Sequence, residues 1–248
     1  SWAVSVSTSQ NATGRRILGV TTCSDHNSQV SALDNNFTQR LSKCYTGAIF
    51  DVMRELGNPD CALPHEIRPL DDTQTLAGPV WTCSGRIDKS ISNDASLLGW
   101  TGLLSKAPSG KVLVCQPNDS TIAHMGELSA ETLKHRGVLG FVVDGGTRDA
   151  AFIRKLGWPM YFRYYSPRDV VGIWGVESTG EPITIGEVQI STGDWILADI
   201  DGVVVIPESL LEEVLDRTEE IMSTENELRT MILDGMDPQE AYKKYRLF

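Results

Sequence analysis

Three charged residues give the sequence its clearest chemical signal. Glu127 lies in "HMGELSAE", and twenty residues (128–147) separate it from the pair Arg148-Asp149 in "VVDGGTRDAA". Two carboxylates beside one guanidinium suit a hard divalent cation, Mg²⁺ or Mn²⁺, together with a carboxylate-bearing substrate. These cations prefer oxygen ligands, and arginine offers a planar pair of donors to a carboxylate or enolate. The alternative interpretation of Arg148-Asp149 is a solvated surface ion pair of little energetic value.

The elements around these residues indicate how they meet. The apolar run 138–143 predicts a buried strand, and the glycines of 144–146 must follow it with a tight turn or a close approach to a ligand. The stretch 120–137 predicts a helix with Gly126-Glu127 near its start, where unpaired backbone N–H groups favour anions. A helix followed by a strand returns the chain to the same edge of a sheet. We therefore expect Glu127 and Arg148-Asp149 to face one cavity at the carboxyl end of a strand.

The rest of the pattern predicts a mixed α/β domain with a central sheet flanked by helices. Residues 1–35 are rich in Ser, Thr, Asn and Gln and predict a poorly ordered or peripheral arm. The core is expected over 36–206 and C-terminal helices over 207–248. Within these, we expect a helix that ends at Gly57, strands over 76–83, 111–115 and 159–165 with a poorly patterned connection over 84–110, a β-rich segment over 183–207, an amphipathic helix after Pro207, and a last helix capped by Asp237-Pro238-Gln239-Glu240.

Composition excludes several classes of partner. The chain has 248 residues and a formal net charge of −11, which argues against binding a nucleic acid through a basic face. No apolar run is long enough to span a bilayer, so no membrane partner is expected. The five cysteines form no CxxC pair, which disfavours zinc and redox sites and favours a reduced, cytoplasmic location. The chain starts at Ser1, which leaves open whether a leader has been removed.

The pattern in which twenty residues separate an acidic residue from Arg-Asp resembles the signature of the 4-hydroxy-4-methyl-2-oxoglutarate aldolase family. That family shares its fold with the regulator of ribonuclease activity A. The resemblance implies an RraA-like swivelling β/β/α domain with a C-terminal helical tail. It covers most of residues 37–245, but 83–112 match poorly and the N-terminal arm does not match. The stretches that look like family landmarks are "RLSKCYTGAIFDVMRELG", "LPHEIRPL", "LAGPVWT", "RGVLGFVVDGGTRD", "RYYSPRD", "GDWILADIDGVVVIPE" and "GMDPQEAYKKY".

The resemblance also implies roles for single residues. Asp149 would hold the divalent metal directly, and Glu127 would hold metal-bound water. Arg148 would bind the pyruvoyl oxygen and stabilise the enolate. The amides around Gly126, Glu127 and Leu128 would receive the substrate carboxylate.

A trimer, or a dimer of trimers, is implied with the site at a subunit interface. An acidic residue from the neighbouring subunit's C-terminal helix would complete the water shell. Glu225 is the candidate and Glu227 the alternative, because "STENELR" does not fix the register. A solvated helix face is the other interpretation of that segment.

The implied reaction is that of a carbon–carbon lyase dependent on Mg²⁺ or Mn²⁺, of the class II pyruvate aldolase type. It would cleave a 2-keto acid to pyruvate through an enolate, and decarboxylation of oxaloacetate would pass through the same enolate. One alternative is a non-catalytic, protein-binding regulator of a ribonuclease. Another is a lyase or hydratase for a different 2-keto acid, with specificity set by residues 84–110 and 164–182.

Several other polar residues have two interpretations. His124 would assist proton transfer near the site or, more simply, have a structural role. Arg168-Asp169 would cap or orient a loop, or Arg168 would reach the substrate. Asp51 would orient site residues without touching the substrate. Asp199 and Asp201 are most simply turn residues.

Overall fold

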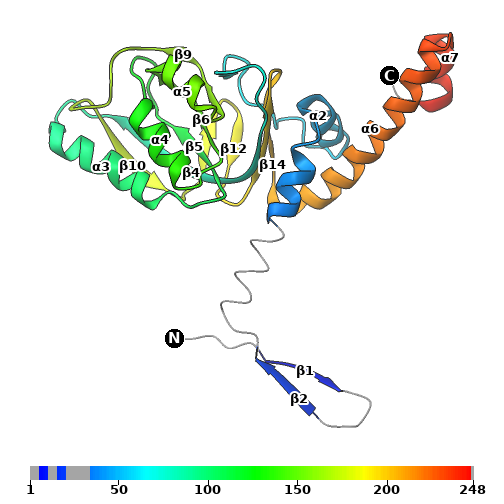
Figure 1. Ribbon diagram of the computed structural model, residues 1–248, viewed down its shortest axis with the longest axis horizontal. Coiled ribbons are helices and arrows are strands. Elements are labelled where there is room, and N and C mark those ends of the chain that lie inside the picture. The colour runs from blue at the N-terminus through cyan, green and yellow to red at the C-terminus, as the bar shows by residue number, and fades with distance from the viewer. Residues whose placement is uncertain (1–5, 11–15, 21–33, 247–248) are drawn as a thin grey trace. The chain divides into compact units, whose positions relative to one another are not determined.

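The computed structural model describes residues 6–10, 16–20 and 34–246, which form two compact units, Ser1–Phe37 and Thr38–Phe248 (Figure 1). In the first unit, β1 (Val6–Gln10) pairs antiparallel with β2 (Arg16–Val20). The sequence predicted no regular element there, because these polar residues show no sustained period. Residues 34 and 35 of the predicted arm are helical, whereas residues 1–5, 11–15 and 21–33 lie outside the described residues, and the disorder predicted for them stays a prediction.

The second unit is built on one mixed sheet. Its strands run in the order β14-β13-β4-β5-β6-β8-β3, and β10 also pairs with β4. The pairs β4–β5, β5–β6 and β6–β8 are parallel, and the others are antiparallel. The strands are β3 (Arg68–Pro69), β4 (Leu76–Ile87), β5 (Val112–Gln116), β6 (Gly140–Val143), β8 (Met160–Phe162), β10 (Trp174–Thr179), β13 (Trp195–Asp199) and β14 (Gly202–Ile206).

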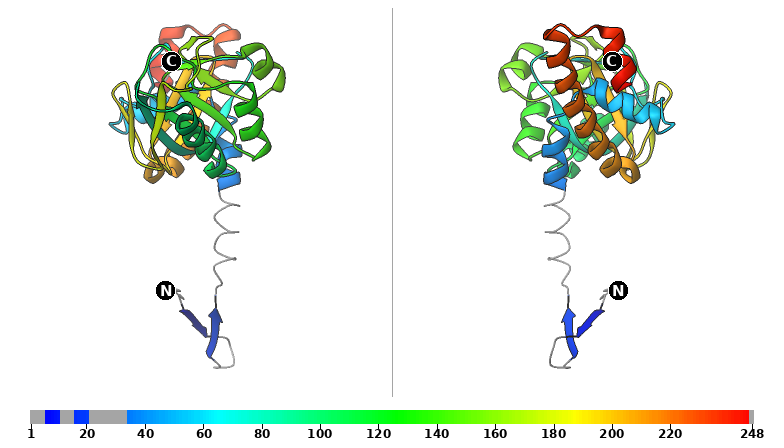
Figure 2. Two further views of the ribbon diagram at one scale, coloured as in Figure 1. Left: turned by 90° about the vertical axis from the view of Figure 1, so that its left-hand side faces the viewer. Right: turned by 90° about the vertical axis from the view of Figure 1, so that its right-hand side faces the viewer.

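Two short strand pairs and several helices complete the described part of this unit, where residues 34–41 are also helical and η1 (Glu208–Leu210) is a short 3-10 helix. β7 (Gly146–Thr147) pairs with β9 (Tyr164–Tyr165), and β11 (Ile183–Ile185) pairs with β12 (Val188–Ile190). The other helices are α2 (Thr46–Glu55), α3 (Asn93–Lys106), α4 (Glu127–His135), α5 (Ala150–Leu156), α6 (Leu211–Leu233) and α7 (Pro238–Tyr245). Figure 2 shows α6 and α7 at the end of the domain that carries α2, and α2 packs on both α6 and β14. None of the helices in the described part of the chain is long and apolar enough to cross a bilayer.

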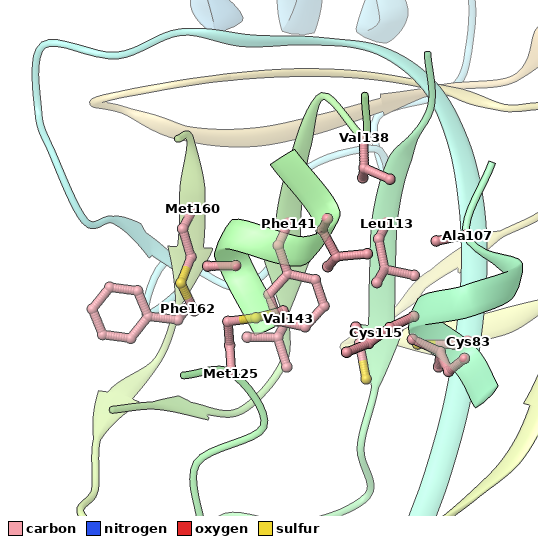
Figure 3. Close-up of a cluster of buried hydrophobic side chains, with 14 of the residues drawn as sticks. Cys83, Ala107, Leu113, Cys115, Met125, Val138, Phe141, Val143, Met160 and Phe162 are labelled. Carbon is pink, nitrogen blue, oxygen red and sulfur yellow. The ribbon is translucent and has the colours of Figure 1, made fainter. Parts of the chain in front are cut away.

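The central strands are buried on both faces. In β5, Leu113 and Cys115 point into a cluster with residues of α3, α4 and α5, while Val112 and Val114 point into a second cluster on the other face. Phe141 and Val143 of β6 join the first cluster, as Figure 3 shows. Strands enclosed in this way need apolar residues at every position, which is why these segments read as continuous apolar runs.

The structure confirms the predicted fold class, an α/β domain with a central sheet flanked by helices and a C-terminal helical tail. The last helix is capped as expected, because the Asp237 carboxylate accepts from the backbone N–H groups of Gln239 and Glu240, and Pro238 opens the helix. Besides elements that were not predicted, such as β1, β2, α5 and β10, three differences have an identifiable physical cause.

The first difference is α3, which fills the segment read as a poorly patterned connection. Its start is capped by Ser92, whose hydroxyl accepts from the Ala95 N–H at 3.1 Å. Gly99 and Gly102 lie inside this helix, and two leucines on it are exposed. These residues obscure the amphipathic period that would have marked the helix in the sequence.

The second difference concerns the helix predicted over 120–137, which begins only at Glu127 and stops as expected before Gly137. The carboxylate of Asp119 accepts from the N–H groups of Thr121 and Ile122 at 2.9 Å and holds the preceding residues in a loop. The loop, and not the helix, therefore carries the chain past His124.

The third difference is a break in the first predicted helix before Thr46. Asp199, expected as a turn residue, accepts from both the N–H and the hydroxyl of Thr46 at 2.8 Å, and it also accepts from the Asp201 N–H in its own turn. A residue 153 positions away thus provides the cap at the start of α2. Such a contact cannot be read from local sequence.

Candidate active site

The structure brings Glu127, Arg148 and Asp149 to one cavity of about 440 Å³, together with Gly126 and Leu128. Glu127 is the first residue of α4, and Asp149 immediately precedes α5. Residues of α3 also line the cavity. The spatial grouping expected from the spacing is therefore present within one chain, and the chemical roles of these residues are proposals.

Several hydrogen bonds join the segments that carry the charged groups. The Arg148 N–H donates to the Met125 carbonyl oxygen at 2.9 Å, and the Glu127 N–H donates to Asp149 Oδ2 at 3.2 Å. Asp149 adopts a left-handed conformation, with φ 55° and ψ 30°, which is uncommon for a residue with a side chain. Its carboxylate bonds to the start of α4 and makes no capping bond to its own helix.

Glycines let these segments approach closely. A Cβ atom on Gly126 would lie 2.8 Å from Asp149 Oδ2 and 3.2 Å from Arg148 Nε. A Cβ atom on Gly145 would lie 2.6 Å from His124 Nδ1, and one on Gly146 would lie 2.6 Å from a backbone oxygen. Neither Gly145 nor Gly146 has a positive φ. The glycines after β6 are therefore needed for close packing, and not for a left-handed turn.

The guanidinium of Arg148 lies between two carboxylates. Its Nη1 donates to Asp169 Oδ2 at 2.9 Å, and its Nε is 3.6 Å from Asp149 Oδ2. The Arg148 side chain is 38% exposed, so these pairs orient it more than they stabilise the fold. Asp169 also accepts from the Val171 N–H, as a loop-orienting residue would. Sequence reasoning missed its contact with Arg148, because nothing local signals a bond across 21 positions.

The neighbouring Arg168 has a different position. Its side chain is exposed and does not line the cavity, while its backbone carbonyl oxygen accepts from the Ala123 N–H at 2.7 Å. Its backbone N–H donates to the Ser166 hydroxyl at 3.3 Å. Within one chain, these bonds favour the loop-orienting interpretation over contact with a substrate.

His124 borders the cavity, but its side chain is buried. The residue is 1% exposed, both ring nitrogens lack a hydrogen-bond partner, and Nε2 lies 3.6 Å from Asp119 Oδ2. The ring meets Trp174 at a steep angle, with centroids 5.4 Å apart. Burial lowers the pKa of His124 from 6.5 to about 4, against the opposing effect of the Asp119 charge. A neutral, enclosed imidazole favours the structural interpretation over proton transfer with a substrate.

The α2–α6 end of the domain holds the other predicted acidic residues. The hydroxyl of Tyr45 donates to Glu225, and burial together with this bond raises the pKa of Tyr45 to about 12. Asp51 pairs with Arg54 at 2.8 Å on α2. Glu227 is exposed on α6. Figure 1 shows α2 and α6 at the opposite end of the domain from α4 and α5, and none of these acids lines the cavity.

The carboxylate oxygens at the cavity fit a magnesium ion better than a softer metal. Among the described residues, no group of three or more His, Cys, Asp or Glu side chains is arranged to hold a metal ion by itself. Mg²⁺ does not require such a cage, because it keeps several waters and binds through one or two carboxylates together with substrate oxygens. Asp149 and Glu127 supply carboxylates of this kind at one cavity.

The chain belongs to the family described as RraA-like, Aldolase/RraA, whose model matches residues 46–205. It is 26% identical over 213 residues to a protein of Halalkalibacterium halodurans named "Putative 4-hydroxy-4-methyl-2-oxoglutarate aldolase", with 86% of this chain and 96% of that protein covered. It is 28% identical over 225 residues to Protein DlpA of Legionella pneumophila, with 85% of this chain covered. The match spans only 34% of the length of DlpA.

The chain is also similar to solved structures. The fold matches Streptomyces coelicolor RraAS2, described as an unusual member of the RNase ES inhibitor RraA protein family, with 26% identity and a TM-score of 0.73. That match covers 80% of this chain and 98% of RraAS2. A structure described as belonging to novel cellulases from microbes associated with the gut ecosystem has 32% identity and a TM-score of 0.74, covering 78% of this chain and 87% of that one.

The close packing at Gly126 generates a prediction about the metal. In Gly126→Ala, the added methyl group must displace the Asp149 carboxylate or the Arg148 guanidinium. We expect the affinity for Mg²⁺, measured by calorimetry, to fall about tenfold or more, as it does when the support of a metal ligand is disturbed. Gly99→Ala is the matched control, because a Cβ atom there meets nothing within 4 Å. Equal Mg²⁺ affinity in both variants would contradict a metal site that depends on the close packing at Gly126.

The burial of His124 generates a prediction about pH. Its folded-state pKa lies below the ordinary value, so the unfolded chain takes up the proton first as the pH falls, and stability is lost between about pH 6.5 and 4. From pH 7 to pH 5 this group alone should remove about 2 kcal/mol from the free energy of unfolding. His124→Gln, measured by urea denaturation at both pH values, should lose less stability by that amount. The same pH dependence in both proteins would contradict a neutral, buried His124.

Proposed function

We propose that this chain is a divalent-metal-dependent carbon–carbon lyase that cleaves a 2-keto acid and releases pyruvate through its enolate. One observation carries the proposal: a single cavity contains Arg148, the carboxylates of Glu127 and Asp149, and the N-terminus of α4. The similarity to a protein of Halalkalibacterium halodurans named as a putative aldolase supports a lyase over other uses of such a cavity.

Arg148 has the central role in this proposal. Its guanidinium donates to the 2-keto oxygen, and Asp169 fixes its orientation at 2.9 Å. When the bond between C3 and C4 of the substrate breaks, its electron pair moves toward the 2-keto oxygen, and the negative charge there grows. A charge-assisted hydrogen bond strengthens as that charge develops, so Arg148 stabilises the transition state more than the bound substrate.

The N-terminus of α4 orients the substrate carboxylate. Backbone N–H groups and the helix dipole favour an anion there, and Gly126 has no side chain to compete for the first-turn amides. The Glu127 N–H donates to Asp149, so the substrate carboxylate must share or replace that bond. The Leu128 N–H, one residue further into the helix, is its second donor in this proposal.

Asp149 would hold Mg²⁺ or Mn²⁺ directly, and Glu127 would hold it through water. When bound, the cation supplies polarisation of the 2-keto oxygen. Oxaloacetate loses carbon dioxide through the same pyruvate enolate, so the same residues would serve that decarboxylation. We also propose a trimer, or a dimer of trimers, in which Glu225 or Glu227 completes the cavity of a neighbouring subunit, since neither lines the cavity of its own chain.

A second candidate function is a non-catalytic regulator of a ribonuclease. The likeness to RraAS2 and the net charge of −11 support it. A protein that only binds another protein has no need of carboxylates and a guanidinium around a cavity, and we therefore place the lyase first. Binding to a ribonuclease, together with no turnover of any 2-keto acid, would reverse that order.

The different roles of Arg148 and Asp149 predict different variant behaviour. Arg148→Lys keeps the charge but loses the planar fork of donors, and we expect kcat to fall by roughly a hundredfold or more. Asp149→Asn should weaken metal binding, so that its activity rises with Mg²⁺ concentrations that already saturate the wild type. The measurement is pyruvate release across a Mg²⁺ titration, with EDTA abolishing wild-type activity.

Thermal unfolding of both variants is the control for folding. If Arg148→Lys unfolds, the Arg148–Asp149 pair is a structural clasp. Wild-type turnover by both variants, or full wild-type activity in EDTA, would contradict the mechanism.

A further inference from the structure

The cavity that contains Arg148 is also lined by residues of α3 and α4, several of them apolar. Leu97, Trp100 and Leu104 of α3 and Leu128 of α4 line it, and we call these four residues the α3–α4 groove. The same cavity is lined by Arg148 and Asp149, so a substrate bound at the charged end would lie beside these apolar residues. We propose that the preferred substrate is a 2-keto acid with one carboxylate and an apolar substituent at C4, and not a dicarboxylic acid. This inference rests on the proposed lyase function.

The charges around the cavity disfavour a second carboxylate. Arg148 is the one lysine or arginine among the described residues that line it, and Asp169 already bonds to that guanidinium. The acidic side chains that line it are Glu127, Asp149 and Asp169. A metal ion and Arg148 would offset the first carboxylate and the 2-keto oxygen. From the described residues of its own chain, a second carboxylate in the groove would gain no cation while losing water, which is costly.

Most of the polar hydrogen atoms near the groove already have acceptors. The Thr101 hydroxyl donates to the Leu97 carbonyl oxygen at 2.7 Å, and the Thr132 hydroxyl donates to the Leu128 carbonyl oxygen at 2.7 Å. The indole N–H of Trp100 donates to the Ser129 hydroxyl at 2.9 Å. These donors would have to give up existing bonds in order to meet a substrate carboxylate.

The groove is a formed surface with apolar side chains at its mouth. Trp100 is buried and packs edge-to-face on Trp174, with centroids 6.0 Å apart, which fixes the floor. Leu97 is 44% exposed and Leu128 is 77% exposed. An apolar substituent that covers these leucines would remove their surface from water and contribute to binding. The volume of about 440 Å³ is within the range of small-molecule sites.

A matched pair of substrates tests the inference. 4-Hydroxy-4-methyl-2-oxopentanoate carries a methyl group where 4-hydroxy-4-methyl-2-oxoglutarate carries its second carboxylate. In the first compound the C3–C4 bond breaks, the hydroxyl proton passes to solvent water and C4 becomes the carbonyl carbon of acetone. The electron pair on C3 then takes a proton from solvent to give pyruvate. With Mg²⁺ present, we expect kcat/KM for the monocarboxylate to exceed that for the dicarboxylate by about tenfold or more.

Charge variants on α3 make the test specific to the groove. Leu97→Arg places a cation in the groove and should shift the ratio of the two kcat/KM values at least about tenfold toward the dicarboxylate. Leu98→Arg is the matched control, because Leu98 is 64% exposed on the same helix and does not line this cavity. It should leave the ratio unchanged. Arg136 donates to the carbonyl oxygen of Ser105, a residue that lines the cavity, so it must be excluded as a partner for the second carboxylate. Arg136→Gln should also leave the ratio of the two kcat/KM values unchanged.

The outcomes separate this inference from the function on which it rests. The inference is overturned, and the lyase function is not, if the wild type has an equal or higher kcat/KM for the dicarboxylate. The same holds if Arg136→Gln loses activity on the dicarboxylate alone. No pyruvate from either compound overturns the lyase. In that case calorimetry with 2-oxopentanoate and 2-oxoglutarate decides the groove: tighter binding of 2-oxopentanoate supports an apolar ligand, and tighter binding of 2-oxoglutarate overturns it.

Discussion

The candidate site depends on the junction between the start of α4 and the Arg148-Asp149 corner. The Arg148 N–H bonds to the Met125 carbonyl oxygen, and the Asp149 carboxylate bonds to the Glu127 N–H. The parallel strands β5 and β6 bring both segments to one edge of the sheet. The left-handed backbone at Asp149 and the bare Gly126 then let the carboxylate meet the amide. Without this junction, the helix terminus, the guanidinium and the carboxylates would not share a cavity.

The two ends of the cavity differ in what they bind. At the junction, an amide-rich helix terminus, a guanidinium and carboxylates suit a metal ion and the negatively charged head of a 2-keto acid. Between α3 and α4 the lining contains four apolar side chains. The hydroxyl groups of Thr101 and Thr132, which also line the cavity, donate to carbonyl oxygens of their own helices. The second end is formed by Leu97, Trp100 and Leu104 of α3 together with Leu128 of α4. If the proposed function holds, substrate preference would follow largely from α3.

The sequence predicted what local pattern and spacing determine. Strands β5 and β6 were predictable because both of their faces are buried, and the charged trio was predictable because helix and strand lengths return the chain to one edge. The start of α4 was predicted too early, because the Asp119 loop bonds depend on backbone geometry. α3 was missed because its glycines and exposed leucines disguise its period. The contact of Asp169 with Arg148 joins residues 21 positions apart and leaves no local signal.

The central claim is that this cavity stabilises the enolate of pyruvate, and hydrogen exchange at the pyruvate methyl group tests it without any choice of substrate. In deuterium oxide, wild-type protein with Mg²⁺ should replace the methyl protons of pyruvate with deuterium faster than buffer with Mg²⁺ alone by a wide margin. Proton NMR measures the rate as the loss of the methyl signal. Exchange should stop in EDTA and should be much slower in Arg148→Lys. Exchange at the buffer rate by folded wild-type protein with saturating Mg²⁺ would contradict the claim.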